Sequence, residues 1–323
     1  MRADVALPLD DPATAFGRIL DGRAGDAEAG AYLVALAERG ETAAEIAAAA
    51  EAMRARMVKV TAPAGAIDVC GTGGDGSHSL NVSTAVAIVA AACGVPVAKH
   101  GNRAASSRAG AADTLEALGL DLARAGALAE RSLAELGIAF LFAQAHHPAL
   151  VALAPLRRAL GRRTIFNLLG PLANPAGVTR QLIGVADRTL LPVMNEACAR
   201  LGSEDAMLVA GDEPLDELSV SGPSTALRLG GAPERVDPVG LGLPRHPIEA
   251  LRGGSATDNA AALRRLLQGE AGAYRDAVLL NTAAALIVAG AARDWQDGIE
   301  EAAEAIDKGL AKALLDCWIA FCR

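Results

Sequence analysis

The sequence has few aromatic residues and no long uninterrupted apolar run. Phe, Trp and Tyr make up 3% of its 323 residues, whereas hydrophobic residues reach 52%, much of it alanine. This composition favours closely packed helices. The apolar stretch at residues 86–97 contains Gly94 and Pro96 and is too short to span a bilayer. The chain does not open with a basic segment followed by an apolar core. We therefore expect neither a signal peptide nor a membrane partner.

Cysteine is also scarce, and its spacing excludes the usual cysteine-based frameworks. The chain has five cysteines, and none forms a CxxC pair: Cys70, Cys93, Cys198, Cys317 and Cys322. An odd and dispersed set is typical of reduced thiols in a cytoplasmic protein and gives no metal framework.

An overall basic charge is absent. The net charge is −8, which argues against a nucleic-acid partner, because such partners normally require a basic face. Two segments are nevertheless free of acids: residues 136–186 hold five arginines, and residues 77–112 hold Lys99, Arg103 and Arg108. Local positive charge on an acidic protein predicts a site for an anionic substrate. The alternative, a solvated charged face, usually mixes both signs.

Residues 68–107 combine a glycine-rich turn with positively charged positions. An apolar strand at 66–70 runs into residues 71–76, of which four are glycine. A helix start rich in hydroxyl groups follows, and a second strand ends at Lys99. Glycines allow a ligand to approach the backbone, and a helix N-terminus offers unpaired N–H groups to an anion. The pattern predicts a cradle for a phosphorylated small molecule.

Two better-known phosphate loops do not fit this segment. Gly71, Gly73 and Gly76 match G-x-G-x-x-G, but the acidic residue that a dinucleotide site needs about 20 positions later is absent. The P-loop requires a lysine where Ser77 stands. A glycine turn without any ligand is the remaining alternative. It is disfavoured because a second anion-binding segment follows within thirty residues.

An adjacent acid pair, Asp216 and Glu217, follows Pro214. Neighbouring residues on a strand face opposite ways, so both acids can serve one site only from a loop or a strand end. Taken alone, such a dipeptide is most often a solvated surface pair. Magnesium binds in proteins through one or two carboxylates together with substrate phosphates, so the pair is also a candidate magnesium site.

The order of apolar segments predicts strands that alternate with helices, and hence a mainly parallel sheet. The expected strands are 66–70, 95–98, 138–142, 182–185, 207–210 and 226–229. Thr42 and Glu45 form a capping box ahead of a helix at 46–57, and Gly40 ends the helix before it. We further expect helix at 148–169 and 298–321, and irregular backbone at 230–246.

Several separated motifs together resemble the anthranilate phosphoribosyltransferase family. They are GTGGDG (71–76), NVST (81–84), KHGNRAASS (99–107), DTLEALG (113–119), FLFAQAHHPA (140–149), RRTIFNLLGPLANP (162–175), LDELSVSGP (215–223) and DAVLLNTAAALIVAG (276–290). The resemblance spans nearly the whole chain, and its specificity comes from the agreement of the motifs.

The resemblance implies an α/β fold, with a small all-helical N-terminal domain and a larger α/β domain around a mainly parallel central sheet. The helical domain would comprise residues 1–63 and be completed by about 148–175. Residues 66–147 and 176–323 would form the α/β domain that binds phosphoribosyl diphosphate. The implied reaction is attack of the anthranilate amine on the anomeric carbon of 5-phosphoribosyl 1-diphosphate (PRPP), in the pathway to tryptophan. A homodimer and two Mg²⁺ ions per subunit are implied as well.

The resemblance also implies the site residues, with no residue acting as an acid or base. Those matching the substrate-binding motifs are Gly71, Gly74, Asp75, Ser79, Asn81, Val82, Ser83, Thr84, Lys99, His100, Gly101, Asn102, Arg103, Ala104, Ala105, Ser106, Ser107 and Arg157. Ser83, Asp216 and Glu217 match the metal ligands. Arg157 would hold the anthranilate carboxylate, with Gly71 and Asn102 nearby, and Lys99 would place a charge on a phosphate.

Some positions depart from the family pattern, and two rival functions remain to be distinguished. Ala109 and Ala111 stand where relatives often carry a hydroxyl group, which puts the strength of phosphate binding in question. Adjacent His146 and His147 precede Pro148, so structural or substrate-channel roles are favoured over a metal site. The rivals are a pyrimidine nucleoside phosphorylase, usually a longer chain, and a catalytically silent relative that binds nucleic acid.

Overall fold

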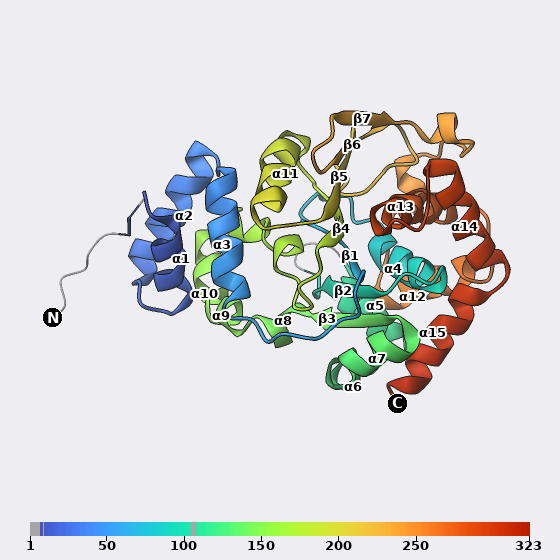
Figure 1. Ribbon diagram of the computed structural model, residues 1–323, viewed down its shortest axis with the longest axis horizontal. Helices are drawn as coiled ribbons and strands as arrows, with labels where there is room; N and C mark the ends of the chain where they lie inside the picture. Colours follow the sequence, from blue (N-terminus) through green and yellow to red (C-terminus); the bar gives the residue numbers. More distant parts are fainter. Residues whose placement is uncertain (1–6, 9, 105–107) are drawn as a thin grey trace.

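The computed structural model describes residues 7–8, 10–104 and 108–323, which include a seven-stranded sheet (Figure 1). The strands lie side by side in the order β3-β2-β1-β4-β5-β6-β7. Neighbouring strands from β3 to β5 pair in parallel, whereas the β5–β6 and β6–β7 pairs are antiparallel. The strands are β1 (Ile67–Gly71), β2 (Val97–Gly101), β3 (Ile138–Phe142), β4 (Arg180–Gly184), β5 (Asp205–Gly211), β6 (Ser224–Arg228) and β7 (Pro233–Val236).

The strand order reverses between β1 and β4. From β1 the chain proceeds outward to β2 and β3, and it then returns to β4 on the other side of β1. In open parallel sheets, ligands bind at the carboxyl ends of the strands at such a switch point. Gly71 and Gly184 face each other at those ends, as the last residues of β1 and β4.

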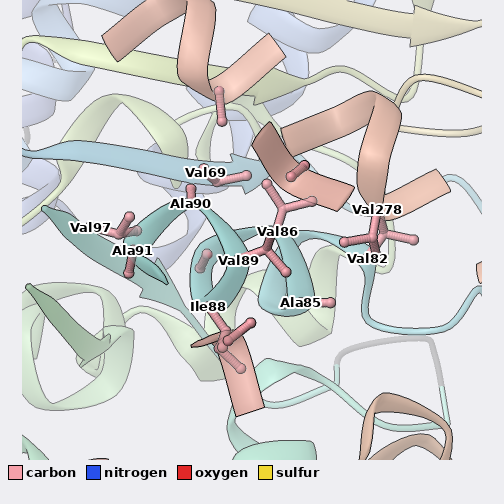
Figure 2. Packing of buried hydrophobic residues seen from close by; sticks show 14 of the residues in the cluster. Val69, Val82, Ala85, Val86, Ile88, Val89, Ala90, Ala91, Val97 and Val278 are labelled. Carbon is pink, nitrogen blue, oxygen red and sulfur yellow. The ribbon is translucent and has the colours of Figure 1, made fainter. Parts of the chain in front are cut away.

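One face of the sheet is covered by α4 (Val82–Ala92) and α13 (Ala273–Ala289). Outside them, α14 (Trp295–Asp307) packs against both helices and α15 (Leu310–Phe321) packs against α4. α4 contacts β1 and β2, and α13 contacts β4, β5 and α4. Apart from Ser83, every residue from Val82 to Ala91 is buried, because this helix is surrounded by apolar neighbours. Figure 2 shows Val82 and Val86 of α4 in one cluster with Val69 of β1 and Val278 of α13.

The other face is covered by α11 (Leu191–Arg200), which contacts both β5 and α3. The helices of the small domain lie beyond it (Figure 1): α1 (Pro12–Leu20), α2 (Asp26–Arg39), α3 (Ala43–Arg54), α9 (Pro148–Ala152) and α10 (Ala154–Leu160). α10 packs against α2, so a distant part of the sequence joins the N-terminal helices. One apolar cluster contains Phe16, Leu156 and Ile183, and it runs from these helices to the sheet.

The remaining short elements connect these layers. The α-helices among them are α5 (Ala111–Leu118), α6 (Leu122–Ala127), α7 (Ala129–Leu136), α8 (Ala143–His146) and α12 (Ala256–Leu266). The 3₁₀ turns are η1 (Ile165–Asn167), η2 (Pro171–Ala173), η3 (Arg188–Leu190), η4 (Pro238–Leu241) and η5 (Ile248–Leu251). None of the helices in the described ranges has both the length and the apolar character needed to cross a membrane.

The expected helix signals near the N-terminus are confirmed. Thr42 caps α3, and its side chain accepts the backbone N–H of Glu45 at 3.3 Å. The Glu45 carboxylate in turn accepts the backbone N–H of Thr42 at 2.9 Å. Gly40 follows α2 with a φ of 88°, a conformation that glycine adopts without strain.

Three expectations about secondary structure are wrong in detail. The segment 230–246 was expected to be irregular because it is rich in proline and glycine, but it contains β7, which extends the sheet. The single helix expected at 298–321 is two helices, because Gly309 adopts a φ of 72° between α14 and α15. The segment 148–169 divides into α9, α10 and η1, and Gly161, with a φ of 59°, ends α10. All six expected strands are present: β3 has the expected bounds, and the ends of the other five are shifted by one to three residues.

Candidate active site

A cavity of about 390 Å³ lies at the carboxyl ends of β1 and β2 and reaches the small domain. Its walls come from the glycine segment, the end of β2, the acid pair and residues of α3, α9 and α10. It brings together most of the site residues expected from the sequence: Gly71, Gly74, Asp75, Ser79, Asn81, Ser83, Lys99, His100, Gly101, Asn102, Arg103, Ala104, Arg157, Asp216 and Glu217.

Five expected site residues are not among those lining the cavity. Val82 and Thr84 are each 1% exposed, and they lie in the first turn of α4 with their side chains in the core. A ligand could reach these two positions only through their backbone. Ala105, Ser106 and Ser107 lie outside the described residues.

The glycine segment leaves backbone groups open to a ligand. Gly73, Gly74 and Gly76 all have φ between 67° and 81°, where a side chain would be strained. The N–H of Gly73 donates to the Asp216 carboxylate at 2.8 Å. The segment is thereby fixed to the acid pair, 143 residues further along the chain.

The Asn81 side chain, at the start of α4, is oriented by two donors. Its Oδ1 accepts the hydroxyl of Thr114 at 2.6 Å and the amide of Asn259 at 2.9 Å. Its Nδ2 donates to the carbonyl of Ala109 at 3.2 Å. Ala109, which is 4% exposed, and Ala111 both line the cavity, so both positions that were expected to lack a hydroxyl group lie at the site.

Asp216 and Glu217 lie in the loop between β5 and β6, as expected from Pro214. This loop crosses directly over the ends of β1 and β4. A Cβ atom on Gly184 would overlap the backbone carbonyl of Asp216, and one on Gly71 would overlap its carboxylate. Glycine at both positions allows the acids to approach the sheet edge. Gly71 was expected at the site, whereas nothing in the sequence analysis indicated Gly184.

The charged forms of both acids are destabilised by their surroundings. Burial, reinforced by the charge of Asp75, raises the pKa of Asp216 to about 6. Burial and then the neighbouring Asp216 charge raise the pKa of Glu217 well above its usual range. Glu217 Oε2 is also buried, and none of the described residues bonds to it. A cation placed here would remove the repulsion and satisfy that oxygen.

The donors fit a magnesium ion that is completed by substrate. Carboxylate and hydroxyl oxygens are hard ligands, and Ser83 Oγ lies in the same wall as the acid pair. Within the described ranges, no cluster of three or more His, Cys, Asp or Glu side chains could hold a metal alone. Oxygens from a phosphorylated ligand would therefore have to complete the coordination shell.

Lys99 lies at the floor of the cavity and is 3% exposed. Its ammonium donates to the carbonyl of Val69 at 2.7 Å and to Ser83 Oγ at 3.2 Å. Burial lowers the pKa of Lys99, and the nearby Asp68 carboxylate opposes that shift. The positive charge therefore acts on the Ser83 side of the cavity.

The end of the cavity nearest the small domain has a different character. It is lined by Met53, Leu150 and Phe166 together with Arg157. The Arg157 guanidinium lies over the Phe166 ring, 5.9 Å from its centroid, and burial lowers the pKa of this arginine. No carboxylate of the described residues pairs with it. By contrast, Arg162 and Arg163 pair with Glu38 and Glu41, as expected for surface arginines.

Two buried histidines complete this apolar end. The rings of His100 and His147 lie 5.0 Å apart, and the Nε2 atom of each has no hydrogen-bond partner in the part of the chain that the structure describes. His100 Nδ1 lies 2.9 Å from the carbonyl of Gly170, so this nitrogen carries the proton and Nε2 is left as an acceptor. His147 is not among the site residues expected from the sequence. One of the two roles expected for it, lining a substrate channel, would place it near the site.

Burial lowers the pKa of both His100 and His147 to about 4, so both rings are neutral at pH 7. A depressed folded-state pKa means that their contribution to stability is complete above the usual value of about 6.5. It is lost as the pH falls from there towards 4. We expect the ring resonances of both histidines, assigned with single glutamine variants, to stay fixed between pH 8 and 5.5. Titration midpoints near 6.5 would contradict this placement.

Arg103 is at the rim and already has partners. It is exposed and bonds to Asp113 at 2.8 Å and to Glu116 on α5, and its guanidinium lies 5.6 Å from the centroid of the Phe142 ring. These contacts hold the end of β2 against α5. A role in phosphate binding at this position would require Arg103 to exchange partners.

Comparisons with known proteins show the family to which the chain belongs. Residues 64–312 match the family described as glycosyl transferase family, a/b domain, and residues 4–57 match its helical bundle domain. An anthranilate phosphoribosyltransferase of Novosphingobium aromaticivorans is 62% identical over 98% of both chains. The chain belongs to the anthranilate phosphoribosyltransferase family. This membership confirms the interpretation of the sequence motifs and the expected fold class.

Solved structures of the family agree with this assignment. The crystal structure of the anthranilate phosphoribosyltransferase from Thermus thermophilus is 44% identical, with a TM-score of 0.92 over 99% of this chain and 97% of that one. The Saccharomyces cerevisiae anthranilate phosphoribosyltransferase in complex with PRPP and Mg is 29% identical, with a TM-score of 0.90 over 98% and 93%. The nucleoside phosphorylase and nucleic-acid-binding alternatives are therefore set aside in favour of the anthranilate phosphoribosyltransferase family.

Proposed function

We propose that this chain transfers the phosphoribosyl group of PRPP to the amine of anthranilate, releasing diphosphate, in the pathway to tryptophan. The observation that carries the proposal is the contrast between the two ends of one cavity. One end has open glycine backbone and an acid pair in which Glu217 Oε2 is buried with no hydrogen-bond partner among the described residues. The other has an arginine that pairs with no carboxylate of the described residues, an aromatic ring and two neutral imidazoles. Family membership supports the same assignment.

The reaction places heavy demands on charge and light demands on proton transfer. The leaving diphosphate is highly charged and the sugar carbon becomes cationic, so positioning and electrostatic stabilisation supply most of the rate. We infer that Gly73 and Gly74 let the diphosphate approach the backbone closely and that Asn81 orients the ribose phosphate. Magnesium held by Asp216, Glu217 and Ser83 would supply the positive charge that neutralises the leaving group. No side chain is assigned as an acid or base.

At the other end we infer that Arg157 holds the anthranilate carboxylate. A guanidinium binds a carboxylate through two parallel hydrogen bonds, which lysine cannot reproduce. The neutral rings of His100 and His147 do not compete with it for that carboxylate. Both rings line the cavity, and the unprotonated Nε2 of His100 is an acceptor, which suits an aromatic amine held nearby with its N–H groups.

The direct test is identification of the products. With anthranilate, PRPP and magnesium, the protein should form one molecule of N-(5-phosphoribosyl)anthranilate for each diphosphate released, as measured by mass spectrometry and phosphorus NMR. Diphosphate release without the N-glycoside would show that the protein only hydrolyses PRPP, and the proposed acceptor would then be wrong.

Arg157→Ala is expected to raise the KM for anthranilate far more than the KM for PRPP. Loss of a hydrogen-bonded charge pair costs about 1.5–3 kcal/mol, or about 10–150-fold in KM. Arg158→Ala is the matched control, because Arg158 is the next residue on α10 and is exposed. Steady-state kinetics with each substrate varied in turn decide the matter. Equal increases in both constants would assign Arg157 a structural role.

The finer expectations on cofactor and assembly are also part of the proposal. We infer two Mg²⁺ ions per subunit, since one carboxylate pair and a diphosphate together offer more oxygens than one octahedral ion needs.

The five cysteines all carry free thiols, which supports a cytoplasmic location. The boundaries 1–63 with about 148–175, and 66–147 with 176–323, describe the proposed division into domains.

We expect a homodimer that assembles through the alanine-rich N-terminal helices, as the family resemblance implies. Light scattering at micromolar concentration should give twice the mass of the chain. A monomeric mass under those conditions would exclude this assembly.

A further inference from the structure

The loop that carries the acid pair is bonded on one side to a single buried residue, Asn281 of α13. Asn281 is 2% exposed. Its Oδ1 accepts the backbone N–H of Leu218 at 2.9 Å, and its Nδ2 donates to the carbonyl of the same Leu218 at 2.9 Å. A third bond, from Nδ2 to the carbonyl of Ala277 at 2.9 Å, satisfies the remaining donor. Both N–H groups of the amide are thereby used, so the side chain has no donor left for a ligand in this arrangement.

Leu218 directly follows Glu217, so Asn281 fixes the backbone at the point where the acid pair ends. Asp216, Glu217 and Asn281 line a void of about 10 Å³, which is room for a single water molecule at most. Asn281 therefore lies immediately behind the carboxylates, on the side away from the main cavity. It does not line that cavity and is not expected to touch substrate.

The helix that carries Asn281 is packed against the helix that carries Ser83. α13 contacts α4, and Val278 of α13 shares an apolar cluster with Val82 and Val86 of α4 (Figure 2). The two bonds from Asn281 thus connect the acid pair to the helical layer that positions Ser83.

We propose that Asn281 is a positioning residue that sets the distance between the acid pair and Ser83 and so determines how tightly the site takes up magnesium with PRPP. Partners that orient metal ligands typically change metal affinity or activity by about 10–100-fold when removed. This inference rests on the proposed magnesium site but not on the identity of the acceptor.

The test compares Asn281→Ser with Thr282→Val. The serine hydroxyl can bond back to the carbonyl of Ala277 but cannot reach Leu218. Thr282 is the next residue on α13 and is fully buried. Its hydroxyl bonds to none of the described residues, so Thr282→Val removes no bond to the loop. Three quantities are measured for each variant: amide hydrogen exchange in residues 212–222, the affinity for Mg²⁺ in the presence of PRPP by calorimetry, and the KM for anthranilate.

For Asn281→Ser we expect faster exchange in the loop and Mg²⁺ affinity weakened by about tenfold or more. The KM for anthranilate should stay within about twofold, because Arg157 is at the other end of the cavity. Thr282→Val should match the wild type in all three. A folded Asn281→Ser protein with unchanged exchange and unchanged Mg²⁺ affinity would overturn the proposal. Equal weakening of Mg²⁺ and anthranilate would also overturn it, since general loosening would explain both.

If Asn281→Ser does not fold, amide hydrogen exchange in the wild-type protein tests the proposal instead. The Leu218 amide should be as protected as those of α13, and Mg²⁺ with PRPP should slow its exchange further. Exchange of Leu218 at the rate of an unprotected amide would overturn the proposal. Failure of the proposed reaction itself would appear differently, as normal Mg²⁺ and PRPP binding without product.

Discussion

Asp216→Asn and Glu217→Gln should each lower turnover by about 10²-fold or more and weaken the response to magnesium. The reason is electrostatic, because an amide keeps the shape of the side chain but removes the charge that would hold a cation against the leaving group. The measurement is the Mg²⁺ dependence of kcat at saturating PRPP and anthranilate. The folded proteins should be at least as stable as the wild type at pH 7, since burial of these charges is unfavourable in the absence of a cation.

Asp212→Asn is the matched control for that experiment. Asp212 lies in the same loop but is exposed and pairs with Arg188 and Arg235, away from the cavity. Its loss should leave the magnesium dependence unchanged. A similar fall in turnover for Asp212→Asn, or unaltered magnesium curves for the two acid-pair variants, would contradict the assignment of Asp216 and Glu217.

Gly184→Ala should have a comparably large effect through geometry alone. Its new methyl group would overlap the carbonyl of Asp216, so the loop must move away from the strand ends. A displacement of about 1 Å in a reacting site can cost about 10²-fold in rate. Overpacking of this kind also destabilises the fold by about 1–3 kcal/mol. The two measurements are kcat and the urea midpoint of unfolding.

Gly126→Ala separates this clash from the general effect of replacing a glycine. Gly126 is exposed in α6, and a Cβ there would meet no atom within 4 Å. That substitution should leave kcat unchanged and stabilise the helix by about 0.5–1 kcal/mol. Wild-type turnover in Gly184→Ala would show that the loop does not rest on the strand ends as described.

Most of the residues that the sequence analysis assigned to PRPP and magnesium line one cavity, and they could be selected from the sequence because they form unusual patterns. Four glycines in six positions, and an acid pair after a proline, depart from ordinary core patterns and can be recognised without a structure. Asp216 and Glu217 were correctly placed in a loop by the argument that a strand would separate them. The parallel sheet followed from the alternation of apolar segments.

Other parts of the site use residues that look ordinary in the sequence. Gly184 ends a strand like many glycines, and its role depends on a loop more than thirty residues later. Asn281 sits in an alanine-rich helix, and only the fold reveals which backbone it bonds. Phe166 and His147 become lining residues because α9, α10 and η1 return to the N-terminal helices. The sequence pattern alone does not encode that return, and it was expected only from the family resemblance.

The break between α14 and α15 and the extra strand β7 have local causes that a pattern cannot resolve. Gly309 could continue a helix at a modest cost, but here it takes a φ of 72° and redirects the chain. β7 contains a proline and is exposed at three of its four positions, as suits the edge of a sheet. The composition of residues 230–246 favoured irregular backbone, but residues 233–236 form a strand because they pair with β6.

The central claim is that one cavity joins PRPP to anthranilate, and loss of anthranilate fluorescence tests it most directly. The protein is mixed with anthranilate, PRPP and Mg²⁺, and parallel samples omit PRPP or contain EDTA. We expect fluorescence to fall only in the complete mixture, and to fall at least about 10²-fold more slowly with Asp216→Asn. Constant fluorescence in the complete mixture, together with phosphate-dependent cleavage of thymidine or uridine by the same protein, would contradict the account.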